Sequence, residues 1–258
     1  MRTVGRVTVY ITGFLRHNPA MPSRAAKPIR KQPPAAEPIA RGSAADRAYA
    51  ELKRRILRNE MPIGRLYLEQ ELADSLRMSR TPVRETLIRL AQEGLVEVRP
   101  RHGMLVRAVS ADDMREIYEV LTCLEATAAG LLAARRPSAA ELVPLRRAVE
   151  EMDQALQRDD LETWAEADER FHRLLVELCG NSRLRAAVGS VLDQAHRVRL
   201  LTLRLRPKPT ASNLDHAQVL TAVARGDVEA AQRVHRAHRE KAGRMLINIL
   251  MRHGLTQF

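Results

Sequence analysis

Apolar residues recur at helical spacing through nearly all of the chain after residue 111, and short breaker segments interrupt this pattern. Aromatic residues make up only 3% of the chain, a composition that favours helix over a large β-sandwich. Amphipathic helices joined by short connections bury their apolar faces by packing side by side. The sequence therefore predicts an all-α antiparallel helical bundle, with helices near 111–135, 138–157, 160–179, 182–205, 211–225 and 227–251.

The segment before this bundle follows a different pattern. A first helix is expected to begin near Asp46 and to end before the breaker segment 61–64, and two more are expected near 69–76 and 81–93, with Ser79 placed to cap the third. Alternating apolar residues then predict two strands, 95–98 and 104–106, joined by a turn that contains Gly103. Three helices followed by a β-hairpin predict a winged helix-turn-helix over residues 45–108. The fold class is therefore mainly α, with a second, all-helical domain over 111–253.

The positive charge is concentrated before the bundle. Of the net charge of +12, residues 1–44 carry +7, residues 45–110 carry +4 and residues 111–258 carry only +1. A polyanion such as DNA is the natural partner for a basic half of this kind. Residues 15–44 hold six prolines and no apolar periodicity, which predicts a disordered basic tail over residues 1–44.

The sequence favours a cytoplasmic protein without a membrane partner. The early apolar run, Val7 to Phe14, is too short to span a bilayer. The two cysteines, Cys123 and Cys179, are too few for a disulfide framework or a cysteine-based metal cluster, so a reducing compartment is the simplest expectation.

The third predicted helix has the features of a DNA-reading element. Arg80 and Arg84 are four residues apart and share one helix face, while Val83 and Leu87 lie on another. Arginine is the side chain best suited to pair with guanine O6 and N7, and Thr81 can reach a phosphate or a thymine methyl group. The sequence therefore predicts a helix that packs by one face and reads DNA by the other.

The predicted hairpin carries basic residues around its glycine. Arg99, Arg101 and His102 precede Gly103, which suits a wing that lies along a phosphate backbone or in a minor groove. Taken alone, each of these charges could equally be an ordinary solvated side chain. Their succession behind a helix-turn-helix favours DNA binding.

Three stretches of this region resemble the GntR family of bacterial repressors: 68–73 (LEQELA), 78–87 (MSRTPVRETL) and 93–96 (EGLV). The resemblance implies that Arg80, Thr81, Arg84 and Gly103 contact double-stranded operator DNA. Many relatives carry an arginine where this chain has Gln70. Glutamine can still reach a phosphate or an adenine edge, but it supplies no charge.

In the helical half, polar residues fall on apolar helix faces. Asp168 and His172 are one turn apart on a helix whose buried face includes Trp164 and Phe171. An inward-facing carboxylate and imidazole need partners.

The partners are expected from the last two helices. His216 and His238 each lie on an apolar face, so four polar side chains are predicted to enter one interior. Such nitrogen and carboxylate ligands suit one divalent ion, Zn²⁺, Ni²⁺ or Mn²⁺. The alternative is a buried Asp–His hydrogen-bond network without metal. His235 falls between polar residues and is expected to be exposed.

The helical half also resembles the effector domain of FadR-like GntR regulators, through segments such as 168–172 (DERFH), 215–216 (DH) and 237–238 (AH). The resemblance implies that Asp168, His172, His216 and His238 hold the ion and that the ion helps to hold a small carboxylate effector. Relatives usually have Glu where this chain has Asp215.

Relatives also commonly place an arginine in the effector pocket at the position where this chain has Leu121. The departure at Leu121 leaves open how an acid effector would be bound. Arg199 or His196 could compensate, and both are taken as candidate effector-binding residues.

The sequence is compatible with three functions. The first is a transcription regulator, a repressor by resemblance, that binds operator DNA as a homodimer and responds to a metabolite. The second is a metal-dependent helical enzyme, since a bound ion can activate water. Against it stand the winged helix and the lack of a nucleophile or an acid–base carboxylate pair, so no enzyme is expected. The third is a DNA-binding module whose helical domain only dimerises.

Overall fold

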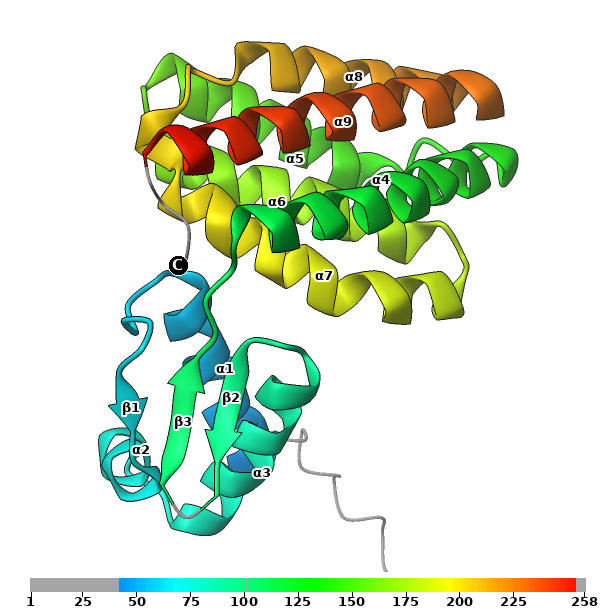
Figure 1. Ribbon diagram of the computed structural model, residues 1–258. Helices are drawn as coiled ribbons and strands as arrows, with labels where there is room; N and C mark the ends of the chain where they lie inside the picture. The colour runs from blue at the N-terminus through cyan, green and yellow to red at the C-terminus, as the bar shows by residue number, and fades with distance from the viewer. Residues whose placement is uncertain (1–41, 101, 254–258) are drawn as a thin grey trace, which may run out of the picture. The chain divides into compact units, whose positions relative to one another are not determined.

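The computed structural model describes residues 42–100 and 102–253, which belong to one compact unit (Figure 1). The chain is mainly helical, with one small antiparallel sheet near its N-terminal side, as the sequence predicts. The first part comprises α1 (Ala44–Leu57), β1 (Leu66–Tyr67), α2 (Glu69–Leu76), α3 (Arg80–Gln92), β2 (Val96–Arg99) and β3 (Gly103–Val106). The tail predicted for residues 1–44 lies, up to residue 41, outside the described residues.

Helix α1 and its cap begin slightly before residue 45, the predicted domain boundary. The Ser43 hydroxyl accepts a hydrogen bond from the backbone N–H of Asp46, and the Asp46 carboxylate in turn accepts one from the backbone N–H of Ser43. This reciprocal cap satisfies N–H groups that the first turn of α1 leaves free. Ser43 and Ala44 therefore belong to the folded part rather than to the tail.

The predicted hairpin is present, and a third strand joins it. The strand order is β1-β3-β2, and both pairs are antiparallel. The sequence interpretation missed β1, because two residues are too few to show an alternating pattern. The sheet and α1–α3 enclose a separate core that contains Leu52, Ile56 and Leu90, all fully buried.

The second part is wholly helical within the described residues. It comprises α4 (Ala111–Ala134), α5 (Val143–Gln157), α6 (Leu161–Leu178), α7 (Ser182–Leu201), the 3-10 turn η1 (Leu203–Leu205), α8 (Thr210–Arg225) and α9 (Val228–Arg252). Helix α5 begins five residues later than predicted. Pro144 lies in its first turn, and a proline is tolerated there but not in a helix interior, so the helix cannot extend much before it.

Helix α4 forms the centre of this helical part. It packs most extensively against α9 and also contacts α6, α7 and α8. Its length and composition would allow it to cross a membrane, but 61% of its most apolar window is buried by neighbouring helices, as in the core helix of a globular domain. The side chains of Leu121, Trp164 and Phe171 fill the surrounding core.

Candidate functional site

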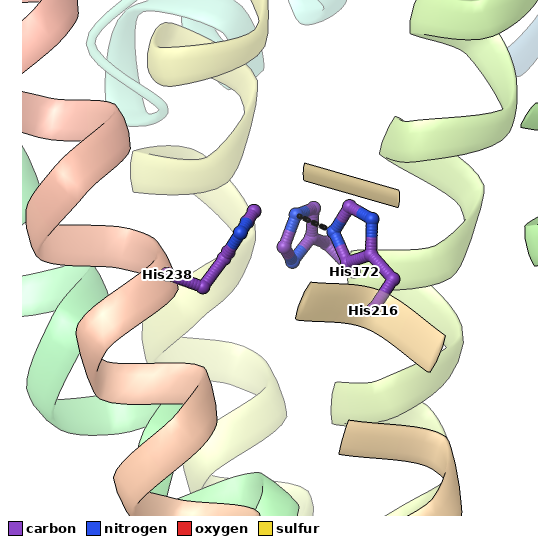
Figure 2. Close-up of side chains that lie close together, drawn as sticks. All are labelled: His172, His216 and His238. Atoms are coloured by element: carbon purple, nitrogen blue, oxygen red, sulfur yellow. Dashed lines mark hydrogen bonds between the residues drawn. The ribbon is translucent and has the colours of Figure 1, made fainter. Parts of the chain in front are cut away.

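Helices α6, α8 and α9 bring the four predicted metal ligands into one interior. Asp168 and His172 extend from α6, His216 from α8 and His238 from α9, and all four side chains are buried. Figure 2 shows the three imidazole rings facing one another between their helices. The helical spacing that placed these residues on apolar faces thus brings them together in the fold.

The distances between these side chains are those of a compact polar centre. One ring nitrogen from each of His172, His216 and His238 lies within 4.8 Å of the others. The Nε2 atoms of His172 and His216 are 3.3 Å apart. Asp168 Oδ1 lies 3.7 Å from His172 Nε2 and 3.6 Å from His216 Nε2.

The protonation states suit metal binding. Burial lowers the pKa of the His216 imidazole well below its ordinary value. Burial also lowers the pKa of His238, although Asp215 partly opposes this change. Only a neutral imidazole has a free lone pair for an ion, so these rings are in the binding form at neutral pH. Three imidazoles and one carboxylate form a donor set that fits a divalent first-row metal.

A second layer of carboxylates faces the outer nitrogens of two rings. His172 Nδ1 lies 3.1 Å from Glu125 Oε2, and His238 Nδ1 lies 3.4 Å from Asp215 Oδ2. A carboxylate at Nδ1 favours the tautomer that carries its proton there, which leaves the Nε2 lone pair available. This arrangement is typical of histidines that bind metals.

Glu125 is the residue that the sequence interpretation missed most clearly. It is fully buried on α4 and accepts two hydrogen bonds from Arg239, at 2.6 and 2.5 Å. Burial alone would raise the pKa of the Glu125 carboxyl, but Arg239, with His172 and His235, holds that pKa well below its ordinary value. A signal was present in the sequence, since Glu125 follows Leu121 by four residues on the apolar face of α4.

The expectation that His235 is exposed is wrong. His235 is fully buried, and its Nε2 atom lies 2.8 Å from Glu125 Oε2. The ring is one turn before Arg239 on α9, and both side chains turn towards Glu125 because that buried carboxylate needs partners from the facing helix. Burial lowers the pKa of His235 to about 3, so the ring is neutral at physiological pH.

The two candidate effector-binding residues occupy different places. Arg199 is 3% exposed, its Nε lies 3.5 Å from Asp168 Oδ2, and its Nη2 donates to Glu169 Oε2 at 2.9 Å. His196 is also buried, but its Nδ1 faces Glu169 at 3.0 Å. Arg199 therefore adjoins the candidate metal centre directly, whereas His196 reaches it through Glu169, a residue that the sequence interpretation did not single out.

The candidate DNA-reading arginines lie at the start of α3. Arg80 and Arg84 are about half exposed, and both donate to the same oxygen of Glu69, at 2.9 and 2.7 Å. Thr81 is exposed beside them. Ser79 occupies the capping position of α3, but its side chain makes no capping hydrogen bond, contrary to the expectation from the sequence.

The other candidate DNA contacts lie on α2 and the hairpin. Gln70 donates to Asp74 at 2.8 Å, and His102 is exposed at the hairpin turn. Arg101 lies outside the described residues. Gly103 is buried with a φ of +115°, and a Cβ atom there would lie 1.9 Å from the carbonyl oxygen of Tyr67, so the close approach of β1 explains the glycine.

A winged helix-turn-helix joined to a helical part with a buried polar centre defines a class of DNA-binding transcription regulators. Residues 44–106 match the family "Bacterial regulatory proteins, gntR family", and residues 116–241 match the FCD domain. The chain belongs to the GntR family and carries a FadR-like C-terminal domain of the FCD type.

The relatives of the chain are transcription regulators rather than enzymes. It is 47% identical, over 50% of its own length and 77% of the relative's, to an uncharacterized HTH-type transcriptional regulator in the TAR-I ttuE-ttuC' intergenic region of Agrobacterium vitis. It is 25% identical to the HTH-type transcriptional repressor RspR of Escherichia coli strain K12, over 74% of this chain and 83% of that one.

Among solved structures, E. coli McbR/YncC has the same fold. The TM-score is 0.70 at 21% sequence identity, and the alignment covers 80% of this chain and 98% of that one.

Proposed function

We propose that this protein is a metal-containing, effector-responsive repressor that binds operator DNA as a homodimer in the cytoplasm. In this proposal residues 45–108 form the DNA-binding domain, and residues 111–253 form the effector-binding and dimerisation domain. The observation that carries the proposal is the buried centre of Asp168 and three histidines in a helical domain that follows a winged helix-turn-helix. Repression is inferred from the relative RspR, which is named a repressor.

The proposed operator contacts divide by chemistry. Arg80 and Arg84 read base edges in the major groove, because their guanidinium groups are exposed at the N-terminal end of α3. Thr81 and Gln70 contact the adjacent backbone or base edges. On the wing, Arg101, His102 and the backbone of Gly103 approach phosphates.

For the metal, we propose that Asp168, His172, His216 and His238 hold one Zn²⁺, Ni²⁺ or Mn²⁺ ion. Such an ion supplies a positive charge, with a coordination position that a carboxylate oxygen can occupy. The neutral imidazoles, and the outer carboxylates of Glu125 and Asp215, support this assignment. Without an ion, the Nε2 atoms of His172 and His216 face each other at 3.3 Å. Two neutral rings can form at most one hydrogen bond there, because one nitrogen must donate and the other must accept.

For the effector, we propose a small organic acid. Arg199 lies beside Asp168 and supplies the positive charge that relatives commonly place at the position of Leu121. Glu169 accepts a hydrogen bond from Arg199 and also faces His196, so it holds Arg199 in position and links it to His196. Because a bound acid would contact α6 and α7 together, it can shift the packing of those helices.

The test is operator binding by the full-length protein. Fluorescence anisotropy with the DNA upstream of its own gene is expected to show specific binding, and Arg84→Ala should weaken it by about 1–3 kcal/mol and relax preference at one base position. Arg115→Ala, on the exposed side of α4, is the matched control and should change nothing. If Arg84→Ala keeps the affinity and the base preference of the parent, the DNA-reading assignment is wrong.

A further inference from the structure

A buried carboxylate on α7 joins the helical part to the DNA-binding part of the chain (α1 to β3). Asp193 is only 1% exposed, and its Oδ2 atom lies 2.5 Å from Nζ of Lys53 on α1. Its Oδ1 atom accepts a hydrogen bond from Arg173 on α6. Ion pairs that are removed from water are screened little by salt, and the loss of one partner is costly. This α1–α7 joint therefore ties the position of α1 to that of α6 and α7.

On the DNA-binding side, the contacts continue from the joint to the end of α3. Lys53 Nζ lies 2.8 Å from Glu93 Oε2, and the Tyr49 hydroxyl donates to Glu93 Oε1 at 2.5 Å. Burial would lower the pKa of the Lys53 ammonium, but Asp193 and Glu93 hold that pKa above its ordinary value, so the group stays charged. Glu93 is the C-terminal cap of α3, the helix that begins with the candidate reading arginines. A shift of Lys53 therefore acts directly on α3.

Helix α7 makes further contacts with the same part of the chain. Gln194 donates to the carbonyl oxygen of Glu93 at 3.2 Å. Arg197 is 3% exposed and donates to Asn59 Oδ1 at 3.1 Å and to the carbonyl oxygen of Arg107 at 2.6 Å. Because both side chains come from one turn of α7, a displacement of that helix is passed to the ends of α1 and α3.

On the helical side, further ion pairs lead from the joint to the candidate metal centre. Arg173 Nη2 lies 2.5 Å from Glu169 Oε1, and the other oxygen of Glu169 accepts a hydrogen bond from Arg199 at 2.9 Å. Arg199 Nε lies 3.5 Å from Oδ2 of Asp168, one of the four proposed metal ligands. Acidic and basic groups thus alternate from Asp168 to Glu93, and each contacts the next. We call this the ion-pair series.

Two cations of the series each have two carboxylate partners. Arg173 lies between Glu169 and Asp193, and Lys53 lies between Asp193 and Glu93. A cation placed between two anions moves towards the one whose charge is less compensated. The series therefore has two arrangements that differ in how firmly Asp193 holds Lys53.

A change of charge at Asp168 reaches the joint through these choices. Without the Asp168 charge, Arg199 pairs more fully with Glu169. Glu169 then holds Arg173 less strongly, because its own charge is better compensated by Arg199. Arg173 consequently pairs more fully with the α7 carboxylate of the joint, which weakens the hold of that carboxylate on α1.

We propose that the ion-pair series couples the candidate metal centre to the position of the DNA-binding part, and that Lys53 and Asp193 are the residues at which this coupling switches. The inference rests on the proposed function at its inner end, because Asp168 is the group whose charge a bound ion would compensate. A weakened joint lets α3 move relative to the helical part. In a dimer such a movement changes the spacing of the two reading helices, which must match the half-sites of the operator.

The first test is a double-mutant cycle on the full-length protein, freed of metal by a chelator. Asp168→Asn removes the inner charge, Lys53→Met removes the joint, and amide hydrogen exchange of α1 is measured by mass spectrometry. Asp168→Asn should speed exchange in the second half of α1 by at least about twofold in the parent, and it should add nothing in Lys53→Met. Asp193→Asn cuts the same joint from α7 and should give the same result as Lys53→Met.

Arg58→Met is the matched control for this cycle. Arg58 is the C-terminal cap of the same helix and pairs with Glu166 on α6 at 2.7 Å, but both side chains are more than half exposed. The effect of Asp168→Asn on α1 should persist in Arg58→Met. Its disappearance there would overturn the proposal, because the whole boundary rather than the buried series would then carry the effect. No effect in the parent, or an effect that survives in Lys53→Met, would overturn it as well.

The second test compares operator affinity with Zn²⁺ and with chelator, measured by fluorescence anisotropy. Zn²⁺ should weaken operator binding by at least about twofold in the parent and in Arg58→Met. Lys53→Met should lose this response while it binds the same amount of zinc. A parent that binds zinc and operator without any response, or a response that survives in Lys53→Met, would overturn the coupling.

The exchange cycle uses neither zinc nor DNA, so it separates this inference from the proposed function. If no zinc is bound but the cycle shows coupling, the metal assignment fails and the ion-pair series stands. If zinc and operator are bound but the cycle shows no coupling, the proposed function stands and the series fails.

Discussion

Gly103 shows how one residue determines the shape of the hairpin. Its positive φ is unfavourable for any other residue, and the Tyr67 carbonyl oxygen occupies the place of a side chain. Gly103→Ala is expected to lower the free energy of unfolding, measured by urea denaturation, by about 1–3 kcal/mol or more.

Gly64 provides the matched control for that change. Its φ is +76°, but nothing lies within 4 Å of the place where a Cβ atom would be. Gly64→Ala should therefore cost only the backbone strain, about 1 kcal/mol. Equal losses at the two positions would mean that the close approach of β1 is not what requires glycine at 103.

Glu125 is the residue through which the second layer acts on the candidate metal centre. Glu125→Gln keeps the shape of the side chain but removes the charge that faces His172 Nδ1 and pairs with Arg239. Metal affinity, measured by competition with a chromophoric chelator, is expected to fall by about 10–100-fold. Glu119→Gln, on the exposed side of the same helix, should have no effect, and an unchanged affinity in Glu125→Gln would contradict the role assigned to this layer.

At the scale of elements, helical periodicity predicted the fold well. The bounds of α2 agree with the prediction, and the other helices differ mainly at their ends. Strand β1 could not be predicted because its pairing with β3 depends on contacts distant in sequence. The start of α5 could have been predicted more accurately from Pro144.

The candidate metal centre was predictable for a different reason. Asp168, His172, His216 and His238 interrupt apolar helix faces, and such interruptions are visible in a sequence.

Helices α2 and α3 are linked by Glu69, which pairs with both candidate base-reading arginines. Such exposed pairs contribute at most about 1 kcal/mol, so Glu69→Gln should change stability little. Loss of the Glu69 carboxylate frees Arg80 and Arg84 and removes a negative charge that repels the DNA phosphates. We expect affinity for random-sequence DNA to rise and the ratio of operator to random binding to fall, measured by anisotropy at constant salt.

Glu71→Gln is the control for this prediction. It removes the same charge from the same helix, but Glu71 pairs with Arg65 rather than with the candidate reading arginines. A similar fall in specificity in both variants would mean that net charge, and not the pairing of Arg80 and Arg84, is responsible.

At the scale of the whole molecule, the proposal requires two copies of the chain. Helix-turn-helix proteins gain affinity by occupying two half-sites at once. Light scattering of the DNA-free protein at micromolar concentration should give the mass of a dimer. A strictly monomeric mass under these conditions would contradict the assignment of residues 111–253 as a dimerisation domain.

The proposed function depends on one divalent ion that Asp168, His172, His216 and His238 hold in the helical domain. The most direct measurement is metal content by mass spectrometry of the protein purified without a histidine tag and supplemented with Zn²⁺, Ni²⁺ or Mn²⁺. We expect one ion per chain in the parent and a large loss of metal in His216→Ala and in His238→Ala. Metal well below one ion per chain in the parent, or full occupancy in both variants, would contradict it.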